Sequence, residues 1–331
     1  MRWGVLGAAN IAVRAVIPAL QRSQSSTVVA IASRTVAKAR TAADATGVER
    51  AYGSYEALLD DPEIEAVYIP LPNHLHVPWA IRAADAGKHV LCEKPIALNA
   101  AEARTLLAAR DRTGVQIAEA FMVRSQPRWH AVREMVREGR IGELKVVAAH
   151  FSYSRRDPGD VRSRVEWGGG ALLDIGCYPV MLSRWLFGAE PVEVMAALER
   201  DPELKIDRLG SAVLRFANGQ ATFTCAGQLV PWQRMQLFGS RGRIDVPIPF
   251  NIRGTDVSRV FVDDGRDLQG TGIETIEFAA ADQYLEQVDQ FAAAVRGLGA
   301  VPMPLEDSVA NMAVLDALFR SAASGRWEAM V

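Results

Sequence analysis

The residues best suited to chemistry lie where an apolar segment meets a charged turn. His89–Cys92 reads as a buried strand and runs directly into Glu93, Lys94 and Pro95. A side chain just past the carboxyl end of a parallel strand lies at the edge where open α/β sheets bind ligands. Pro95 restricts the backbone of Lys94, so the turn is stiff. The ammonium group is therefore a catalytic candidate, with a solvated lysine in a strand-to-helix loop as the alternative.

A second candidate segment begins with three glycines at 168–170 and continues with Asp174 and Tyr178. On a helix, residues four apart share one face, and the positions around this pair are apolar. One interpretation is a buried tyrosine whose hydroxyl is satisfied by the aspartate. The other is an acid/base site that Lys94 faces. A nearby ammonium lowers the pKa of a phenol, so the tyrosine could exchange a proton with a substrate hydroxyl near neutral pH.

The start of the chain carries a relaxed form of the glycine turn that binds dinucleotides. Gly7 follows an apolar strand and allows a tight turn, and the small Ala9 lets backbone N–H groups approach a pyrophosphate. Ala12 lets the following helix pack closely on the strand. Glycine is usual at all three positions and is present only at the first, so a turn that binds nothing is the alternative. The place of this turn at the start of a βαβ pattern favours the nucleotide site.

The end of the second expected strand indicates which nucleotide binds. An NAD enzyme normally places an acidic residue there for the ribose hydroxyls, whereas this chain has Ser33, Arg34 and, one turn into the next helix, Lys38. These hydroxyl, guanidinium and ammonium groups fit a 2′-phosphate. The alternative is a solvated basic helix start, but two cations at a helix N-terminus oppose the helix dipole unless an anion offsets them. NADP is therefore expected, and NAD is possible.

The third expected strand ends in Leu71, Pro72 and Asn73, with His74 and His76 after them. The prolines at 70 and 72 keep the backbone extended. A loop in this place would lie against the nicotinamide half of the cofactor. Either histidine is a candidate general base, although a structural role is more common at a helix start.

Residues 2–120 alternate short apolar strands with helical patterns, which predicts an α/β, Rossmann-type, doubly wound parallel sheet. The expected strands are Trp3–Leu6, Thr27–Ser33, Ala66–Ile69, His89–Cys92 and Val115–Ala118. The expected helices are Ile11–Gln21, Val36–Thr46, Ser54–Leu59, His76–Ala86 and Ala100–Thr113. We expect this dinucleotide-binding domain to span residues 1–121.

The pattern changes after Phe121, where turn residues such as Asn218-Gly219 separate apolar runs and predict a mostly antiparallel, open sheet. The runs are Leu144–Tyr153, Val192–Glu199, Ala212–Phe216, Ala221–Ala226 and Met235–Phe238. Helices expected at Gly170–Leu186, Gln283–Arg296 and Glu306–Ser321 would cover one face. Apolar outward positions predict a second subunit on the other face. Residues 122–331 are thus expected to form an α+β domain for substrate binding and oligomerisation, in a homodimer or homotetramer.

Composition excludes several classes of partner. The 37 Lys and Arg residues nearly balance the 39 Asp and Glu residues, for a formal net charge of −2, so no overall basic field favours nucleic acid or a membrane surface. Cys92, Cys177 and Cys225 are scattered, without the spacing of a zinc site or a disulfide frame, and no metal is expected. No apolar run is long enough to cross a membrane, and no signal-like core opens the chain, which predicts a cytoplasmic protein.

Together these segments resemble the Gfo/Idh/MocA oxidoreductases, the family of glucose–fructose oxidoreductase and inositol dehydrogenase. The resemblance covers almost the whole chain and includes the relaxed glycine turn, Leu71–His74, Ala86–Pro95, Glu119–Met122, Gly168–Tyr178 and Asp282–Tyr284. Inositol dehydrogenase-like members usually carry His four residues after the aspartate. Tyr178 instead makes the chain similar to the branch of glucose–fructose oxidoreductase, NADP-dependent D-xylose dehydrogenase, dimeric dihydrodiol dehydrogenase and ketosugar reductases.

The resemblance implies roles for individual residues. Lys94 and Tyr178 would form the catalytic pair, and Asp174 would orient the substrate or the tyrosine. Pro95 would follow a cis peptide bond. The expected cofactor site comprises Gly7, Ala9, Asn10, Ile11, Ser33, Arg34, Lys38, Leu71, Pro72, Asn73, His76, Glu93, Lys94 and Arg124. The expected substrate site comprises Lys94, Arg162, Trp167, Asp174, Tyr178 and Tyr284.

The expected function is an NADP(H)-dependent oxidoreductase that transfers hydride between nicotinamide and a carbinol or carbonyl carbon of a sugar. The sugar would be a pyranose such as xylose or glucose, or a related polyol ring. A trans-dihydrodiol dehydrogenase or a ketosugar reductase would use the same groups. The alternative from another class is a non-catalytic NADP(H)-binding regulator, but a pure sensor needs none of Lys94, Asp174 and Tyr178.

Overall fold

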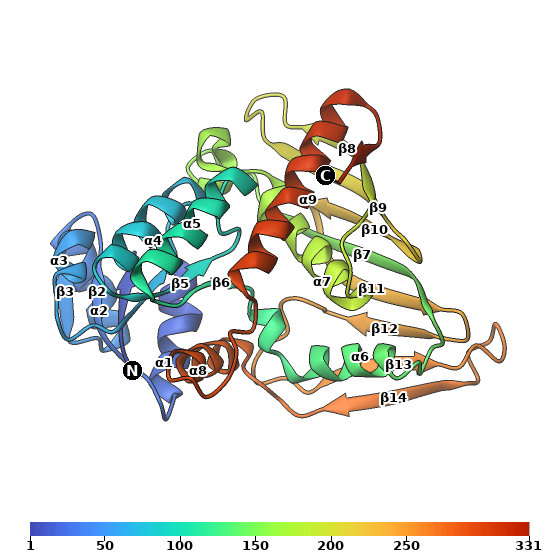
Figure 1. Ribbon diagram of the computed structural model, residues 1–331, viewed down its shortest axis with the longest axis horizontal. Helices are drawn as coiled ribbons and strands as arrows, with labels where there is room; N and C mark the ends of the chain where they lie inside the picture. The colour runs from blue at the N-terminus through green and yellow to red at the C-terminus, as the bar shows by residue number, and fades with distance from the viewer. Residues whose placement is uncertain (331) are drawn as a thin grey trace. The chain divides into compact units, whose positions relative to one another are not determined.

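The computed structural model describes residues 1–330, which form two compact units (Figure 1). The first unit comprises residues 1–126 and 282–309, and the second comprises 127–281 and the chain from 310 onward. The first unit thus extends past residue 121, where the predicted dinucleotide-binding domain ends. A short segment beyond that boundary, and a helix from late in the chain, belong to the first unit.

A six-stranded, fully parallel sheet forms the centre of the first unit, in the order β3-β2-β1-β4-β5-β6. The strands are β1 (Arg2–Leu6), β2 (Thr27–Ala32), β3 (Arg50–Tyr52), β4 (Ala66–Ile69), β5 (His89–Glu93) and β6 (Ile117–Ala120). The predicted doubly wound sheet is confirmed, with one additional strand, β3. Strand order reverses between β1 and β4, and the carboxyl ends of strands at such a point line the ligand crevice of open α/β sheets.

The helices of the first unit begin and end largely where caps predict. The side chains of Thr35, Ser54 and Asn99 accept backbone N–H groups at the starts of three helices, and Gly114 ends one in the left-handed conformation. The helical elements that lie wholly within the first unit are η1 (Ala12–Val16), α1 (Ile17–Arg22), α2 (Val36–Thr46), α3 (Tyr55–Leu59), η2 (Asn73–Leu75), α4 (His76–Asp85), α5 (Ala100–Thr113), η3 (Met122–Ser125) and α8 (Gln283–Val295).

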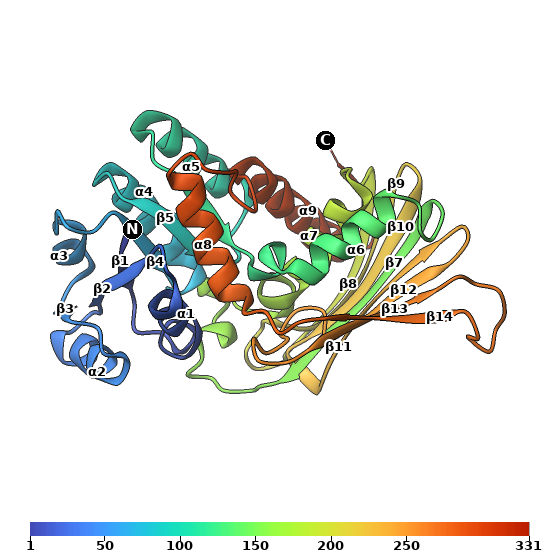
Figure 2. The same cartoon turned by 90° about the horizontal axis from the view of Figure 1, so that it is seen from below.

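Helix α8 belongs to the first unit because its buried face completes the first core. The Phe291 ring lies 5.4 Å from the Trp3 ring of β1, and Figure 2 shows α8 beside α1. With its amide oriented to match its neighbours, Gln287 accepts the backbone N–H groups of Phe121 and Met122. These contacts fix η3 to α8, so both belong with the parallel sheet.

The second unit is built on a nine-stranded sheet in the order β14-β13-β12-β11-β7-β10-β9-β8-β15. Neighbouring strands are antiparallel except β7 and β10, which are parallel, so the predicted mostly antiparallel sheet is confirmed. The strands are β7 (Leu144–Ser154), β8 (Glu193–Arg200), β9 (Asp207–Phe216), β10 (Gly219–Ala226), β11 (Gln228–Gly239), β12 (Arg243–Pro247), β13 (Ser258–Asp263), β14 (Ile273–Phe278) and β15 (Glu328–Ala329).

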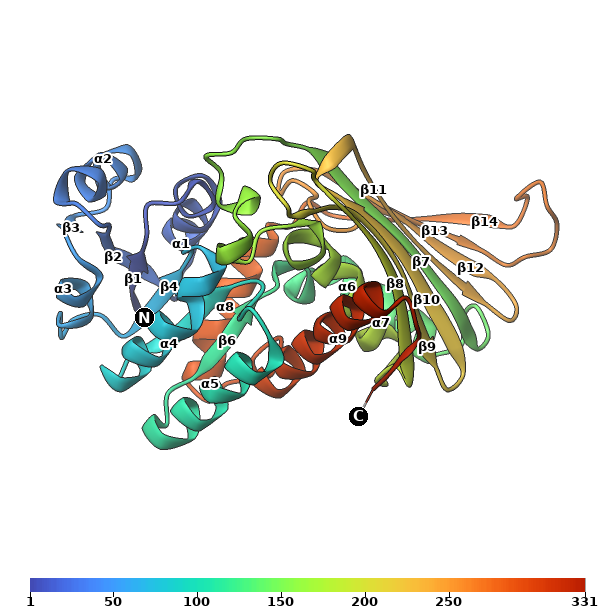
Figure 3. The ribbon, with the colours of Figure 1, turned by 90° about the horizontal axis from the view of Figure 1, so that it is seen from above.

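Helices lie on one face of this sheet. Figure 3 shows α6 (Pro127–Arg137) and α7 (Cys177–Phe187) on that face, and no helix of residues 1–330 covers the other. A π-helical turn, η6 (Leu172–Gly176), leads into α7, and the loop before it contains η4 (Val161–Ser163) and η5 (Val165–Trp167). Helix α9 (Leu305–Ser324) begins in the first unit and ends in the second. Within residues 1–330, none of the helices has the length and hydropathy needed to cross a membrane.

Candidate active site

The turn after β1 requires a glycine. Gly7 has a φ of +128° and donates its N–H to the Ala32 carbonyl at 3.0 Å. A Cβ at Gly7 would lie 3.0 Å from the Leu71 side chain, so this turn and the β4–α4 loop pack tightly together. Asn10 and Ile11 then lead into η1. The predicted cofactor residues of the two loops therefore lie at adjacent strand ends, a geometry that suits a pyrophosphate at a helix start.

Two cations stand at the start of α2. Ser33 is buried and donates its N–H to the Tyr52 carbonyl, while Arg34 and Lys38 are solvent-exposed. The Thr35 hydroxyl caps the helix by accepting the Lys38 N–H at 3.3 Å. The exposed cations, together with the first-turn N–H groups, fit a phosphate at this end of β2.

The carboxylate of Glu93 holds the Lys94 turn. The Lys94–Pro95 peptide bond is cis, as the resemblance implied. Glu93 accepts the Tyr68 O–H at 2.6 Å through one oxygen and the Lys94 N–H at 3.3 Å through the other. Burial, followed by the charge of Glu93, raises the pKa of Tyr68 well above its usual value, so Tyr68 remains a hydrogen-bond donor.

His76 has a structural position and is not a reachable general base. Its side chain is fully buried, and its two ring nitrogens lie 2.7 Å from the carbonyl oxygens of Leu71 and Pro95. Burial lowers the pKa of His76 to about 4, so the ring is neutral at pH 7. His76 therefore ties the β4–α4 loop to the Lys94 turn, and any contribution to cofactor binding would act through those loops.

Glu119 is a site residue that sequence reasoning included only as part of a motif. Its buried carboxyl accepts the Ile96 N–H at 2.9 Å, one residue past Pro95. Burial raises the pKa of Glu119 to about 8, against the smaller opposing effect of the hydrogen bond from the Ile96 N–H. A buried acid at the end of an apolar strand is the sequence signal that could have found it.

We expect the stability of the protein to depend on Glu119 between pH 5 and 8. The folded-state pKa lies above the unfolded value, so this carboxyl stabilises the fold fully below the unfolded pKa, and the effect is lost as pH rises through about 8. Glu119→Gln should therefore flatten the fall of Tm across this range. Glu56→Gln, at an exposed surface ion pair with Arg82, is the matched control. Parallel Tm curves for wild type and Glu119→Gln would contradict the assignment.

Two further predicted residues of the first unit, the buried Arg124 and the partly buried Tyr284, are influenced by acidic groups. Arg124 pairs with Asp307 at 2.7 Å, and its side chain is 7% exposed. Tyr284, expected at the substrate, opens α8, and burial followed by the charge of Glu93 raises its pKa. Tyr284 therefore lies in the electrostatic environment of the same carboxylate that holds Tyr68.

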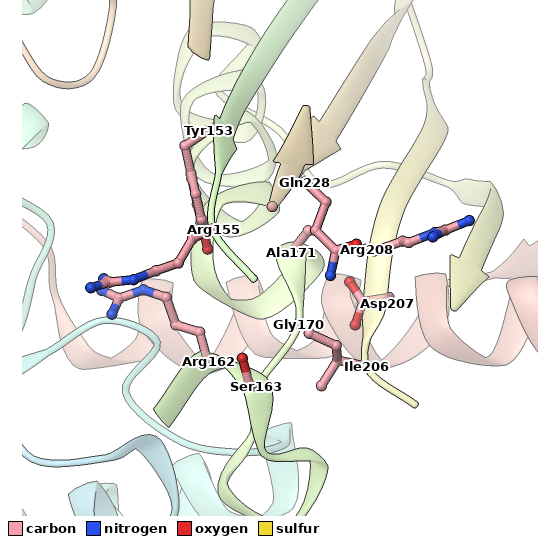
Figure 4. A pocket seen from close by; sticks show the side chains of 11 residues that line it. Tyr153, Arg155, Arg162, Ser163, Gly170, Ala171, Ile206, Asp207, Arg208 and Gln228 are labelled. Atoms are coloured by element: carbon pink, nitrogen blue, oxygen red, sulfur yellow. The ribbon is translucent and has the colours of Figure 1, made fainter. Parts of the chain in front are cut away.

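In the second unit, Asp174 is the centre of a hydrogen-bonded network. One carboxylate oxygen accepts the Tyr153 O–H at 2.6 Å and the Arg162 Nε–H at 2.9 Å. Asp160 pairs with both Arg155 and Arg162, whose guanidinium groups lie side by side in Figure 4. Burial and the charge of Asp174 raise the pKa of the Tyr153 phenol. The network fixes the position of Asp174, whose role as an orienting group for the substrate or Tyr178 stays a prediction.

Two of the three glycines, Gly169 and Gly170, pass close to other protein groups. A Cβ on Gly169 would lie 2.4 Å from the Arg162 carbonyl oxygen, and a Cβ on Gly170 would lie 2.0 Å from Asp207. Asp207 accepts the Leu172 N–H at 2.6 Å, at the start of η6, beside a cavity of about 10 Å³ (Figure 4). This volume holds about one water molecule. Glycines at 169 and 170 therefore allow the loop backbone to fold closely on itself and to pass beside Asp207 at the start of η6.

Tyr178 lies in an aromatic cluster. Its side chain is buried, 4% exposed, with the Phe250 ring at 5.4 Å and the Phe151 ring at 5.8 Å. The helix predicted at Gly170–Leu186 is present as η6 followed by α7, but Asp174 lies in its π-helical turn, whereas Tyr178 lies in the α-helical part that starts at Cys177. A π-turn has wider spacing than an α-turn, so sequence separation alone does not fix the relative directions of Asp174 and Tyr178.

Trp167 lies at the end of η5, immediately before the glycines, and the Arg164 guanidinium stands 5.5 Å from its ring centroid. The expected substrate residues Arg162, Trp167, Asp174 and Tyr178 all belong to the second unit, whereas Lys94 and Tyr284 belong to the first. Their assembly into one site stays a prediction. Within the described residues 1–330, no group of three or more His, Cys, Asp or Glu side chains could hold a metal ion.

Comparison with known proteins decides the family. Residues 1–121 match the model of the oxidoreductase family with an NAD-binding Rossmann fold, and residues 129–245 match the GFO/IDH/MocA C-terminal domain. The chain belongs to the Gfo/Idh/MocA oxidoreductases. Its membership confirms the predicted family and fold class, and it makes the chain an oxidoreductase.

Several similar proteins cover nearly the whole of this chain. The chain is 47% identical to an oxidoreductase of Rhizobium meliloti, over 99% of this chain and 98% of the relative. It is 37% identical to D-xylose 1-dehydrogenase (NADP⁺) 2 of Haloferax volcanii over 98% of both chains. A 3-ketoreductase from Actinomadura kijaniata, crystallised with NADP and TDP-benzene, superposes with a TM-score of 0.89 at 33% identity and covers 97% of each chain.

Proposed function

We propose that this oxidoreductase uses NADP(H) and acts on a carbinol or carbonyl group of a sugar, with a pyranose such as xylose or glucose as the first candidate. The observation that carries the proposal is the Lys94 turn at the carboxyl end of β5, on a dinucleotide-binding sheet, combined with the buried Tyr178 of the second unit. A xylose dehydrogenase among similar members supports the sugar. Xylose is the first substrate to test.

The cofactor would be held by residues that suit its charges. The Gly7 turn and the helix start after it would bind the pyrophosphate, and Ser33, Arg34 and Lys38 would bind a 2′-phosphate. Leu71, Pro72 and Asn73 would border the nicotinamide half. NADP in the similar 3-ketoreductase supports this choice over NAD. The bound nicotinamide supplies or accepts hydride.

Proton transfer would belong to Tyr178. In oxidation, the Tyr178 oxygen takes the proton of the carbinol hydroxyl, and in reduction it returns a proton to the developing alkoxide. The Lys94 ammonium would stabilise the tyrosinate and the alkoxide. Asp174, fixed by Tyr153 and Arg162, would orient the sugar hydroxyls.

A second candidate is reduction of a ketosugar, or oxidation of a trans-dihydrodiol, by the same groups. The fold similarity to a 3-ketoreductase favours the ketosugar. A panel of aldoses and diols with NADP⁺, and of ketosugars with NADPH, separates these possibilities by initial rate. Tight NADPH binding without turnover on any member of the panel would favour the non-catalytic regulator.

The proposal includes a homo-oligomer formed through the open face of the nine-stranded sheet. A hollow of about 580 Å³ lies on this sheet, and His150 and Arg234 are the only ionisable residues that line it. Trp232 is 54% exposed there, and uncovered apolar surface of this kind marks interaction sites. Light scattering that gives the monomer mass at micromolar concentration would overturn this part.

A further inference from the structure

The turn that follows β12 holds an isoleucine in an unfavourable backbone conformation. Ile248 has a φ of +45° and lies between Pro247 and Pro249. A β-branched residue is an outlier at positive φ, and the residue before a proline is normally confined to extended conformations. Such a residue persists only where its surroundings determine it. The Ile248 side chain is 49% exposed, so burial of this side chain is not what holds the turn.

Two buried side chains of α6 hold the turn. The Arg128 guanidinium donates to the carbonyl oxygens of Pro247 at 3.1 Å and Ile248 at 2.9 Å, with the Pro249 carbonyl at 3.5 Å. The Trp129 indole N–H also donates to the Pro249 carbonyl, at 2.8 Å. Both side chains are almost fully buried. Three successive carbonyl groups are thus directed at one end of one helix.

Arg128 is protonated at neutral pH, although burial lowers its pKa to about 10. Among residues 1–330, its bonding partners are these carbonyl groups, and it forms no ion pair with a carboxylate. A buried charge is costly unless dipoles compensate it. The carbonyl dipoles of the turn therefore stabilise the buried charge of Arg128, and the Arg128 guanidinium in turn holds the turn in its conformation.

Phe250 follows the turn directly, so the turn determines its position. Its ring is fully buried, stacks on Phe151 at 4.7 Å and 16°, and lies 5.4 Å from the Tyr178 ring. Its backbone N–H donates to the Gln233 side chain at 3.3 Å. The position of Phe250, and thus one wall of the Tyr178 environment, depends on the conformation two residues earlier.

We propose that the Ile248 turn, held by Arg128 and Trp129, is a positioning element that sets the Tyr178 ring through Phe250. This inference rests on the proposed function of Tyr178 as the proton-transfer group. Ile248 and Arg128 are positioning residues in it, because they act through Phe250. A displacement of about 1 Å at a reacting group costs up to 10²-fold in rate, so a turn that fixes this ring has a measurable effect.

Glycine at 248 tests the proposal, since it adopts the positive φ without strain and also makes accessible other backbone conformations that isoleucine before a proline does not adopt, so the turn is less precisely fixed although Arg128 and Trp129 remain. In Ile248→Gly we expect Tm to stay level or rise by about 2–4 °C. We also expect kcat to fall about tenfold, with the substrate KM within about twofold, and the pH–rate profile to shift. Lys205→Gly is the matched control. Lys205 has a φ of +62° in the exposed β8–β9 turn of the same unit, and its replacement should leave kcat and the profile unchanged.

A readout independent of turnover separates this inference from the proposed function. With ¹³Cζ-labelled tyrosine, the Tyr178 resonance is identified among six by its loss in Tyr178→Phe. Its chemical shift and titration should change in Ile248→Gly and in Arg128→Lys, but not in Lys205→Gly. An unchanged Tyr178 resonance and pH–rate profile in Ile248→Gly would overturn the positioning role. If the wild type turns over no sugar or diol, the proposed function fails, and the resonance still decides the role of the turn.

Discussion

Tyr178→Phe is expected to lower kcat by about 10²–10⁴-fold, the usual contribution of a positioned acid/base group. The phenylalanine ring can occupy the same place against Phe151 and Phe250, so folding and NADPH affinity should be retained. The loss should therefore appear in kcat and kcat/KM equally, since the hydroxyl acts in the transition state. Steady-state kinetics with the best substrate, together with a fluorescence titration of NADPH, provide the measurement.

Two further variants accompany Tyr178→Phe: one removes the proposed partner of the tyrosine, and the other is a control for the loss of a tyrosine hydroxyl. Lys94→Ala should cause a loss of similar order. Tyr52→Phe removes a hydroxyl that donates to the Asp61 carboxylate at 2.9 Å, and should leave turnover unchanged. Full activity of Tyr178→Phe or of Lys94→Ala would exclude the assigned proton-transfer pair.

The elements best predicted from the sequence are those with strong local signals. β4 and α2 occur at the predicted residues, Ala66–Ile69 and Val36–Thr46. The first is a fully buried run, and the second begins at a capping threonine and ends at a left-handed glycine. By contrast, β3 is a three-residue edge strand without a buried residue, and β14 has no buried residue either. Such strands are defined by their neighbours in the sheet, so local sequence gives little indication of them.

The residue types of the site were predictable, whereas their partners were not. Tyr153 and Asp174 are 21 residues apart, and Arg124 and Asp307 are 183 apart, and no local pattern pairs such groups. The glycine run indicated a close approach correctly, but the groups approached include Asp207. His76 was ambiguous in sequence because the groups that face its ring nitrogens are backbone carbonyls, whose positions depend on the tertiary fold.

Arg34→Ala is expected to weaken NADPH binding by about 10–100-fold, because a hydrogen bond to a charged group contributes about 1.5–3 kcal/mol. Lys38→Ala should have a smaller effect, since its ammonium lacks the bidentate geometry of a guanidinium. Calorimetric titration of NADPH and NADH into each variant measures both effects. The loss for NADPH should shrink as ionic strength rises, because both side chains are solvent-exposed.

NADH decides the interpretation, because it carries the same pyrophosphate and nicotinamide without the 2′-phosphate. If Arg34 and Lys38 bind that phosphate, NADH affinity should be nearly unchanged in both variants. The ratio of NADPH affinity to NADH affinity should then fall by the same factor as the NADPH affinity itself. Arg40→Ala is the matched control, an exposed arginine of the same helix that pairs with Asp44 at 3.8 Å. Equal losses for the two nucleotides would assign the cations to the general electrostatic field of the site. A loss of NADPH affinity in Arg40→Ala as large as in Arg34→Ala would lead to the same conclusion, since removing any nearby positive charge would then weaken NADPH binding equally.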